Sequence, residues 1–128
     1  MTVLISRIEA ADLDTTDIGF LLQSAAKAEE SWANIAKEIA EGRAVVWRIL
    51  AQHSRGVLLT SVRDGMLFVW HLAGRGLWRN HKSIARGVQE IVKRNGLKGI
   101  QGESIPTIAK LLTRQGFTSP RSVVEWRV

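Results

Sequence analysis

Apolar residues in the first third of the chain recur first at strand spacing and then at helix spacing. Residues 3–8 (VLISRI) predict a short strand, which the polar stretch 9–17 ends. Between residues 18 and 39, apolar side chains return every three or four positions, which predicts one long amphipathic helix or two abutting ones. Ser31 is the candidate cap of a second helix, and Gly42 is the stop signal. The first helix is expected to be capped by Thr15, Thr16 or Asp17.

Three strand-like runs follow, separated by short polar connections. They cover residues 44–50, 56–62 and 66–73. Asp64-Gly65 lies between the last two runs and is a hairpin signal, because glycine accepts the positive φ that tight turns need. The sequence therefore predicts an antiparallel meander.

A long helix is predicted over residues 78–95, with Gly96 as its end. Its apolar face is formed by His81, Ile84, Val88, Ile91 and Val92. On the opposite face four basic residues share a narrow arc that Glu90 interrupts: Arg79, Lys82, Arg86 and Lys93.

The last third of the chain predicts a strand, a helix and a strand. The first strand covers residues 97–101, and the last covers residues 123–128. Ser104 is expected to cap the helix between them, with Pro106 in its first turn. The whole order is β–α(α)–β–β–β–α–β–α–β. This order predicts an α/β (α+β) fold in a single domain over residues 1–128, with a mixed central sheet and helices on both faces.

Composition adds a charge asymmetry to this picture. The net charge is +6, but residues 1–64 carry −2 and residues 65–128 carry +8. The basic half is therefore expected to face phosphates, nucleic acid or an acidic partner, unless it is only a solvated surface. The chain has no cysteine, which excludes disulfides and thiolate chemistry. No apolar run is long enough to span a membrane, and no signal peptide is evident, so we expect a soluble, unexported protein.

Two segments of the second half resemble the GNAT (N-acetyltransferase) superfamily. The stretch MLFVWHLAGRGLWRNHKSIARGVQEIVKRNGLKGI is similar to the family's central strand, cofactor loop, long helix and next strand. The stretch IPTIAKLLTRQGFTSPRSVVEWRV is similar to its final helix and last strand. The Leu-x-Gly loop, the Trp after it and the Gly-Phe ending also resemble short acetyltransferase-like proteins of tailed phages. The resemblance covers essentially the whole chain and implies a GNAT-like fold.

The resemblance implies acetyl-CoA as cofactor and no metal. In the family its pyrophosphate lies on backbone N–H groups where a loop reading Arg/Gln-x-x-Gly-x-Gly/Ala enters the long helix. The nearest match begins at His71, but counting back from Gly96 places the family's glycines near Trp78 and Asn80, about four residues later. Both registers stay open. The candidate cofactor-binding residues are Leu72, Ala73, Gly74, Arg75, Gly76, Arg79 and Asn80, and Lys82 is a further candidate phosphate contact.

The residues that family members use for acid–base chemistry are poorly matched. A family Tyr on the last helix falls on Leu112, a common Asn falls on Ile105, and the chain has no Tyr at all. The candidate proton acceptors are His71 on the central strand and Glu103 after the next strand. The competing interpretation makes His71 a packed strand residue, and Glu103 a residue that supports the start of the next helix.

The five tryptophans divide into two groups. Core or seam packing is expected for Trp32, Trp47, Trp70 and Trp126. Trp78 lies between Arg75 and Arg79 at a loop–helix junction. We expect it to pack over the loop, with a protein-interface anchor or a base-stacking platform as alternatives.

Three functions compete on these observations. The first is a non-catalytic phage-type protein with a degenerate acetyl-CoA site, acting as a virion or assembly component and bound to other phage structural proteins or to itself. It is expected in the virion or the host cytoplasm. The second is an active acetyl-CoA-dependent N-acetyltransferase acting on an amine. The third is a nucleic-acid-associated module that uses Arg79, Lys82, Arg86 and Lys93.

Overall fold

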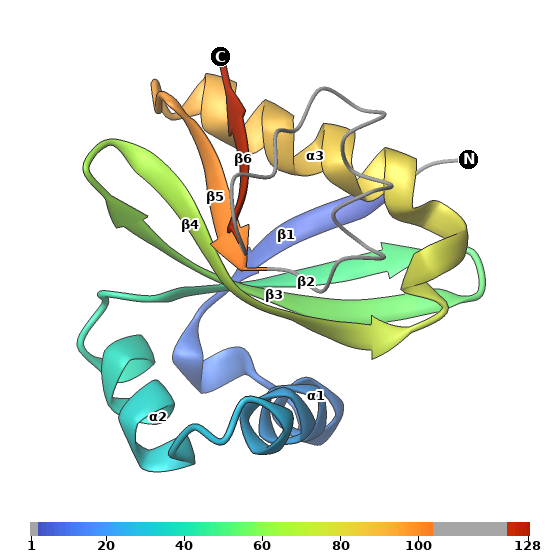
Figure 1. The fold of residues 1–128 in the computed structure, drawn as a ribbon. Coiled ribbons are helices and arrows are strands. Elements are labelled where there is room, and N and C mark those ends of the chain that lie inside the picture. Colours follow the sequence, from blue (N-terminus) through green and yellow to red (C-terminus); the bar gives the residue numbers. More distant parts are fainter. Residues whose placement is uncertain (1–2, 104–122) are drawn as a thin grey trace.

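The computed structural model describes residues 3–103 and 123–128, which form one mixed sheet with helices on both faces (Figure 1). The six strands follow the order β1-β2-β3-β4-β5-β6 in the sheet. Neighbours pair antiparallel except β4 and β5, which pair parallel. The strands are β1 (Leu4–Ile8), β2 (Val45–Ala51), β3 (Ser54–Arg63), β4 (Met66–Arg75), β5 (Gly99–Glu103) and β6 (Val123–Arg127). The predicted fold class and meander are confirmed.

Two helices cover one face of the sheet, α1 (Thr15–Lys27) and α2 (Trp32–Ala40). The alternative of one long helix is wrong, because the backbone turns at Glu29, whose φ is 57°. Ser31 caps α2 as predicted, since its Oγ accepts the Asn34 N–H. The first cap is corrected to Asp14, which follows the short 3₁₀ helix η1 (Ala10–Asp12). The carboxylate of Asp14 accepts the Asp17 N–H at 2.8 Å, and Asp17 accepts the Asp14 N–H at 3.1 Å.

The other face carries α3 (His81–Arg94), preceded by the 3₁₀ helix η2 (Leu77–Asn80). The helix therefore begins three residues later than predicted. His81, expected on its apolar face, is only partly buried and stacks on Trp78 instead, with ring centroids 5.2 Å apart. The basic arc is exposed as expected: Arg79, Lys82, Arg86 and Lys93.

Each face of the sheet has its own core. Ile84, Val88 and Val92 of α3 pack with Ile49, Leu58, Leu67 and Ile100 of the sheet. Phe20, Leu21 and Ile35 of α1 and α2 pack with Val46, Val57 and Leu59. The packing predicted for four tryptophans is confirmed, since Trp47 and Trp126 lie against the first core and Trp32 and Trp70 against the second.

The connections between these elements agree with the sequence only in part. Asp64 and Gly65 both have positive φ, 52° and 77°, so the predicted hairpin turn is confirmed. The strand predicted over 97–101 begins at Gly99 instead, because the Leu97 and Lys98 N–H groups bond to Val92 and Gly65. The helix predicted after Ser104, with Pro106, Ile105 and Leu112, lies outside the described residues. Within residues 3–103 and 123–128, no helix is both long and apolar enough to cross a membrane.

Candidate functional site

β4 and β5 pair over a short length only. Only Met66–Val69 of β4 pairs with β5, although β4 continues to Arg75. β5 ends at Glu103, one residue after Gly102 makes the last pairing with β4, and Figure 1 shows β4 continuing past that end. Along residues 70–75, the edge of β4 that faces β5 therefore has no strand partner among the described residues. Peptide groups on such an edge are available to a ligand.

A β-bulge lies at the point where this pairing ends. Val69 pairs with Thr60 and His71 pairs with Leu59, so Trp70 is an extra residue with no opposite partner on β3. A bulge interrupts the alternation of side chains along a strand. As a result Trp70 and His71 both project toward the face covered by α1 and α2, where Trp70 packs against the second core and His71 meets Ser24 of α1.

His71 is buried, with 5% of its surface exposed, and both of its ring nitrogens have partners. Nδ1 lies 2.6 Å from Ser24 Oγ, and Nε2 lies 3.3 Å from Glu30 Oε2. The other Glu30 oxygen accepts the Trp70 indole N–H at 3.0 Å. An ionised carboxylate only accepts hydrogen bonds, so Nε2 of the neutral ring carries the proton and Nδ1 accepts the Ser24 hydroxyl. The three polar groups thus form one chain directed toward Glu30.

The connection from β4 to α3 is a tight turn that begins at Gly76. Gly76 has a φ of 69°, and a Cβ there would meet the His53 carbonyl oxygen at 2.5 Å. The buried Asn80 donates to Ser54 Oγ at 2.6 Å, and Ser54 donates to the Gly76 carbonyl at 2.7 Å. The side chain of Asn80 therefore stabilises the turn. Because its amide group donates to Ser54, a direct contact between this side chain and a ligand stays a prediction.

Gly74, also a candidate loop residue, lies inside β4 and pairs with Gly56. A Cβ on Gly74 would come within 2.4 Å of the Arg55 carbonyl oxygen. Leu72 and Ala73 lie in the same strand, with Leu72 exposed and Ala73 packed against the second core. The loop between β4 and α3 therefore covers residues 76–80. This position is closer to the second of the two predicted registers, the one counted back from Gly96.

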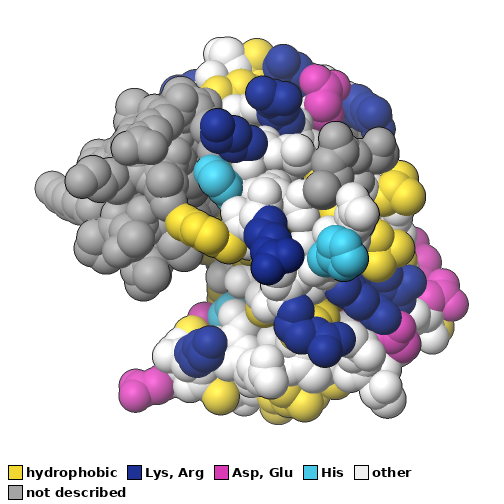
Figure 2. Space-filling view, turned by 90° about the vertical axis from the view of Figure 1, so that its right-hand side faces the viewer, with side chains coloured by type: hydrophobic (Ala, Val, Ile, Leu, Met, Phe, Trp, Pro, Cys, Tyr) yellow, Lys and Arg dark blue, Asp and Glu magenta, His cyan; other side chains and the backbone are white. Residues whose placement is uncertain are grey.

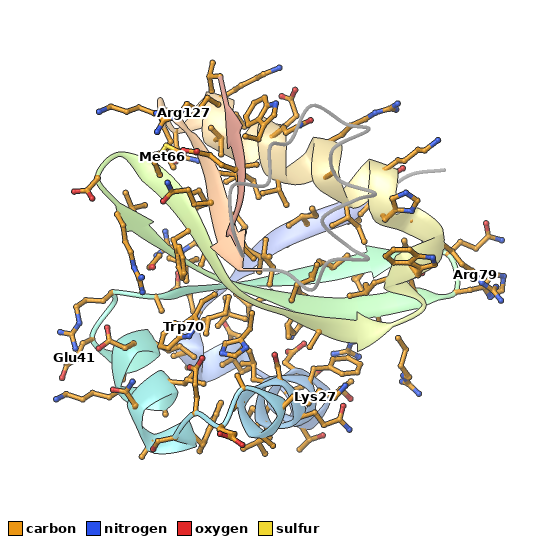
Figure 3. All side chains as sticks on the ribbon, viewed as in Figure 1. Lys27, Glu41, Met66, Trp70, Arg79 and Arg127 are labelled. Atoms are coloured by element: carbon orange, nitrogen blue, oxygen red, sulfur yellow. The ribbon has the colours of Figure 1, made fainter. Side chains whose placement is uncertain are left out.

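Cationic and aromatic side chains surround the start of α3. Arg75, Arg79 and Lys82 are exposed, and Figure 3 shows Arg79 pointing away from the sheet. Trp78 is 51% exposed and its ring stacks on His81 at the start of α3, so its packing over the loop stays a prediction. Lys and Arg side chains are spread over the face of the molecule at this end (Figure 2).

A hollow of about 860 Å³ lies away from this turn. It is lined at one side by α2, the start of β2, the end of β3 and the first half of β4, and at the other by the end of α3. Trp70 lines the hollow and also bonds to Glu30, so the bulge connects the two regions. Figure 3 shows the Trp70 side chain between α2 and the sheet.

Solved structures that this chain resembles include several acetyltransferases. The chain is similar to an IAA acetyltransferase from Bacillus cereus (TM-score 0.75, 14% identity, 99% of this chain and 100% of that one). It is similar to a Bacillus subtilis acetyltransferase in complex with CoA (TM-score 0.78, 12% identity, 99% of each chain). It is also similar to the Escherichia coli ribosomal-protein-S18-alanine N-acetyltransferase (TM-score 0.67, 13% identity, 99% of this chain and 94% of that one).

The chain has the GNAT fold. No family model and no curated protein matches the sequence. At these identities the likeness extends to the fold alone, so a GNAT activity has to be argued from the residues present.

The residues of this GNAT fold suit a coenzyme A thioester at the β4 edge. On the edge of residues 70–75 that has no strand partner among the described residues, the peptide groups match the amide groups of a pantetheine arm, and the cations at the start of α3 match the phosphates of coenzyme A. Glu103 ends β5, but its side chain lies outside the described residues, so its role stays a prediction. In the described part of the chain, no group of three or more His, Asp and Glu side chains is placed to hold a metal ion.

Sequence reasoning singled out His71 as a candidate but missed its hydrogen-bond partners Ser24 and Glu30. Neither residue has a local motif, since 47 and 41 positions separate them from His71 in the chain. The one available signal was the position of Glu30 at the break between two predicted helices.

Proposed function

We propose that this protein is an acetyltransferase that binds acetyl-CoA along the open edge of β4 and transfers the acetyl group to an amine. The observation that carries the proposal is the end of the β4–β5 pairing at Val69, which leaves the edge of residues 70–75 without a strand partner among the described residues. The bulge at Trp70 places a polar chain, Ser24–His71–Glu30, at the start of that edge.

In this proposal the residues divide the work by position. Arg79 and Lys82 hold phosphate groups, and the edge of β4 orients the thioester, which supplies an electrophilic carbonyl carbon. The hydrogen-bonded series Ser24–His71–Glu30 accepts a proton from the amine. The protein has no Tyr to protonate the departing thiol, so rate enhancement rests mainly on holding the two reactants together.

Isothermal titration with acetyl-CoA tests the proposal. We expect micromolar binding to the wild-type protein and about tenfold weaker binding to an R79Q/K82Q double variant, since two charge-assisted contacts are lost. A K93Q variant at the far end of α3 is the matched control. Undetectable binding to the wild-type protein would refute the proposal.

A second proposal is a non-catalytic component with a degenerate acetyl-CoA site, of the short phage type and acting in a virion or its assembly. One observation favours it: Trp78 and Asn80 place side chains in the turn where the family uses bare glycine backbone, and Asn80 is committed to Ser54. The same titration separates the two, because only this proposal expects no heat of binding. Stable co-sedimentation with virion proteins would then support it.

A further inference from the structure

The position of Glu30 is set by the way α1 ends. Its N–H bonds to the Ala25 carbonyl at 2.9 Å, and the Glu29 N–H bonds to the Ala26 carbonyl at 3.2 Å. Together with the positive φ of Glu29, these bonds form a Schellman motif. The residue in the place of Glu30 commonly makes an apolar contact with the helix in such motifs. Here it is a carboxylate directed at the bulge of β4.

The carboxylate of Glu30 has capacity for a further partner. Trp70 and His71 each supply one donor, whereas an ionised carboxylate offers about four acceptor positions. Its side chain is 30% exposed, so a ligand can reach it. No Lys or Arg of the described residues forms an ion pair with it. A partly exposed negative charge beside an indole ring favours the binding of an ammonium group.

A cation lies farther along the same side of β4. Phe68 is two residues before Trp70, and residues two apart in a strand project to the same face about 7 Å from each other. The Arg63 guanidinium lies 4.0 Å from the centroid of the Phe68 ring. Arg63 lines the same hollow as Trp70 and forms no ion pair shorter than 4 Å with a described residue, although its charge helps to lower the pKa of the nearby Glu38. Glu30 itself does not line the hollow, but it bonds to Trp70, which lines it together with Arg63. An anionic group next to the hollow and a cationic group within it therefore lie on the same side of β4.

We propose that Glu30 binds the ammonium group of the acyl acceptor and that Arg63 binds an anionic group of the same molecule. The acceptor class is then a zwitterionic primary amine, such as an amino acid or a short peptide. This inference rests on the proposed acetyltransferase function. His71 is a positioning residue, since it touches Glu30 and not the acceptor.

Acetyl transfer at this site converts an ammonium group and a thioester into an amide and a thiol. The ammonium group loses one proton through Glu30 to solvent, and its nitrogen lone pair forms a new bond to the acyl carbon. The acyl carbon–sulfur bond breaks, and the sulfur leaves with the bonding pair. The second proton lost by the nitrogen ends on the departing thiol, which leaves an amide, a free thiol and one released proton.

Three matched probes test the inference without requiring turnover: 6-aminohexanoate, hexylamine and hexanoate. The readout is the ¹H–¹⁵N signal of the Trp70 indole, assigned by its loss in W70F. We expect the zwitterion to shift this signal at the lowest concentration, hexylamine to need more, and hexanoate to leave it unchanged. E30Q removes the charge but keeps a carbonyl oxygen that can accept the Trp70 N–H, and it should weaken both amines about tenfold. E29Q, which changes a neighbouring exposed carboxylate, should match the wild-type protein.

Each result decides part of the inference. An unshifted Trp70 signal with both amines, or equal shifts in E30Q and wild-type protein, would overturn the ammonium site. Equal affinities for 6-aminohexanoate and hexylamine, or an unchanged ratio between them in R63Q, would overturn the role of Arg63. Titration of the same samples with acetyl-CoA separates these failures from failure of the proposed function, because E30Q should bind acetyl-CoA like the wild-type protein.

Discussion

Arg48 binds the fully buried carboxylate of Asp17 through two parallel hydrogen bonds. Its Nε lies 3.2 Å from Oδ1, and its Nη2 lies 2.5 Å from Oδ2. Arg55 adds contacts to Asp17 at 3.3 Å and to Asp14 at 2.5 Å. These bonds join the start of α1 to β2 and β3, and they hold the helix that carries Ser24 against the sheet.

Replacing Asp17 with Asn should lower the free energy of unfolding by about 2–4 kcal/mol. The change removes the buried anion that both guanidinium groups share and leaves them only Asp14, which is exposed and lies 3.8 Å from Arg48, and breaking such a buried pair is costly. Urea unfolding followed by circular dichroism measures the loss. D12N changes an exposed acid close by and should have little effect, so a D17N protein as stable as D12N would contradict the prediction.

The same carboxylates predict a loss of stability in acid. The Asp17 N–H, followed by the Arg55 side chain, lowers the pKa of Asp14 from 3.8 to about 2. Burial alone would raise the pKa of Asp17, but hydrogen bonds from Arg48, the Asp14 N–H and Arg55 together lower it below 3.8. A folded-state pKa below the unfolded value stabilises the fold above about pH 4, and this contribution is lost as the pH falls toward 2. Urea midpoints measured between pH 5 and 2 should fall steeply for the wild-type protein and less steeply for D17N.

Much of this fold follows from periodicity and turn chemistry in the sequence. Residues 18–39 show helix spacing, and Ser31 at the right place predicted the second cap. Asp64-Gly65 predicted the hairpin because few residue pairs accept two positive φ values. The cap at Asp14 was missed because Thr15, Thr16 and Asp17 are equally good cap residues by type.

The site was harder to predict because it depends on contacts between distant residues. The bulge at Trp70 has no sequence signature, yet it turns His71 toward α1 and so creates the chain to Glu30. The loop register was left open because glycine at 74 and 76 looks like a phosphate loop. In the structure Gly74 serves the close approach of β4 to β3 instead.

Replacing Glu29 with Gly should raise the free energy of unfolding by about 0.5–1 kcal/mol. Glu29 has a φ of 57°, a conformation that costs a residue with a Cβ about 1–2 kcal/mol and glycine little. Thermal unfolding should show a higher midpoint for E29G, whereas E29A keeps the strain and should show no gain. A gain of equal size in E29A would mean that the side chain, and not the backbone, is responsible.

Replacing Gly74 or Gly76 with Ala should destabilise the fold even in the absence of a ligand. Each new Cβ would come within about 2.5 Å of a carbonyl oxygen, from Arg55 or His53. Close contacts with backbone force local shifts, at a cost of about 1–3 kcal/mol. Differential scanning calorimetry should show lower midpoints for both variants. An unchanged midpoint in G76A would mean that the turn before α3 relaxes easily.

The basic arc at α3, called a stripe below, offers a test that distinguishes a thioester site from a nucleic-acid surface. Lys82 lies at the start of the helix and Lys93 lies eleven residues later, about 16 Å along the axis. A ligand on the turn before α3 contacts only the first, whereas a nucleic-acid backbone that follows the stripe contacts both. K82Q should therefore weaken acetyl-CoA binding severalfold while K93Q leaves it unchanged, as measured by titration at low salt. If both variants weaken a single-stranded oligonucleotide equally, and neither changes acetyl-CoA binding, the stripe serves nucleic acid instead.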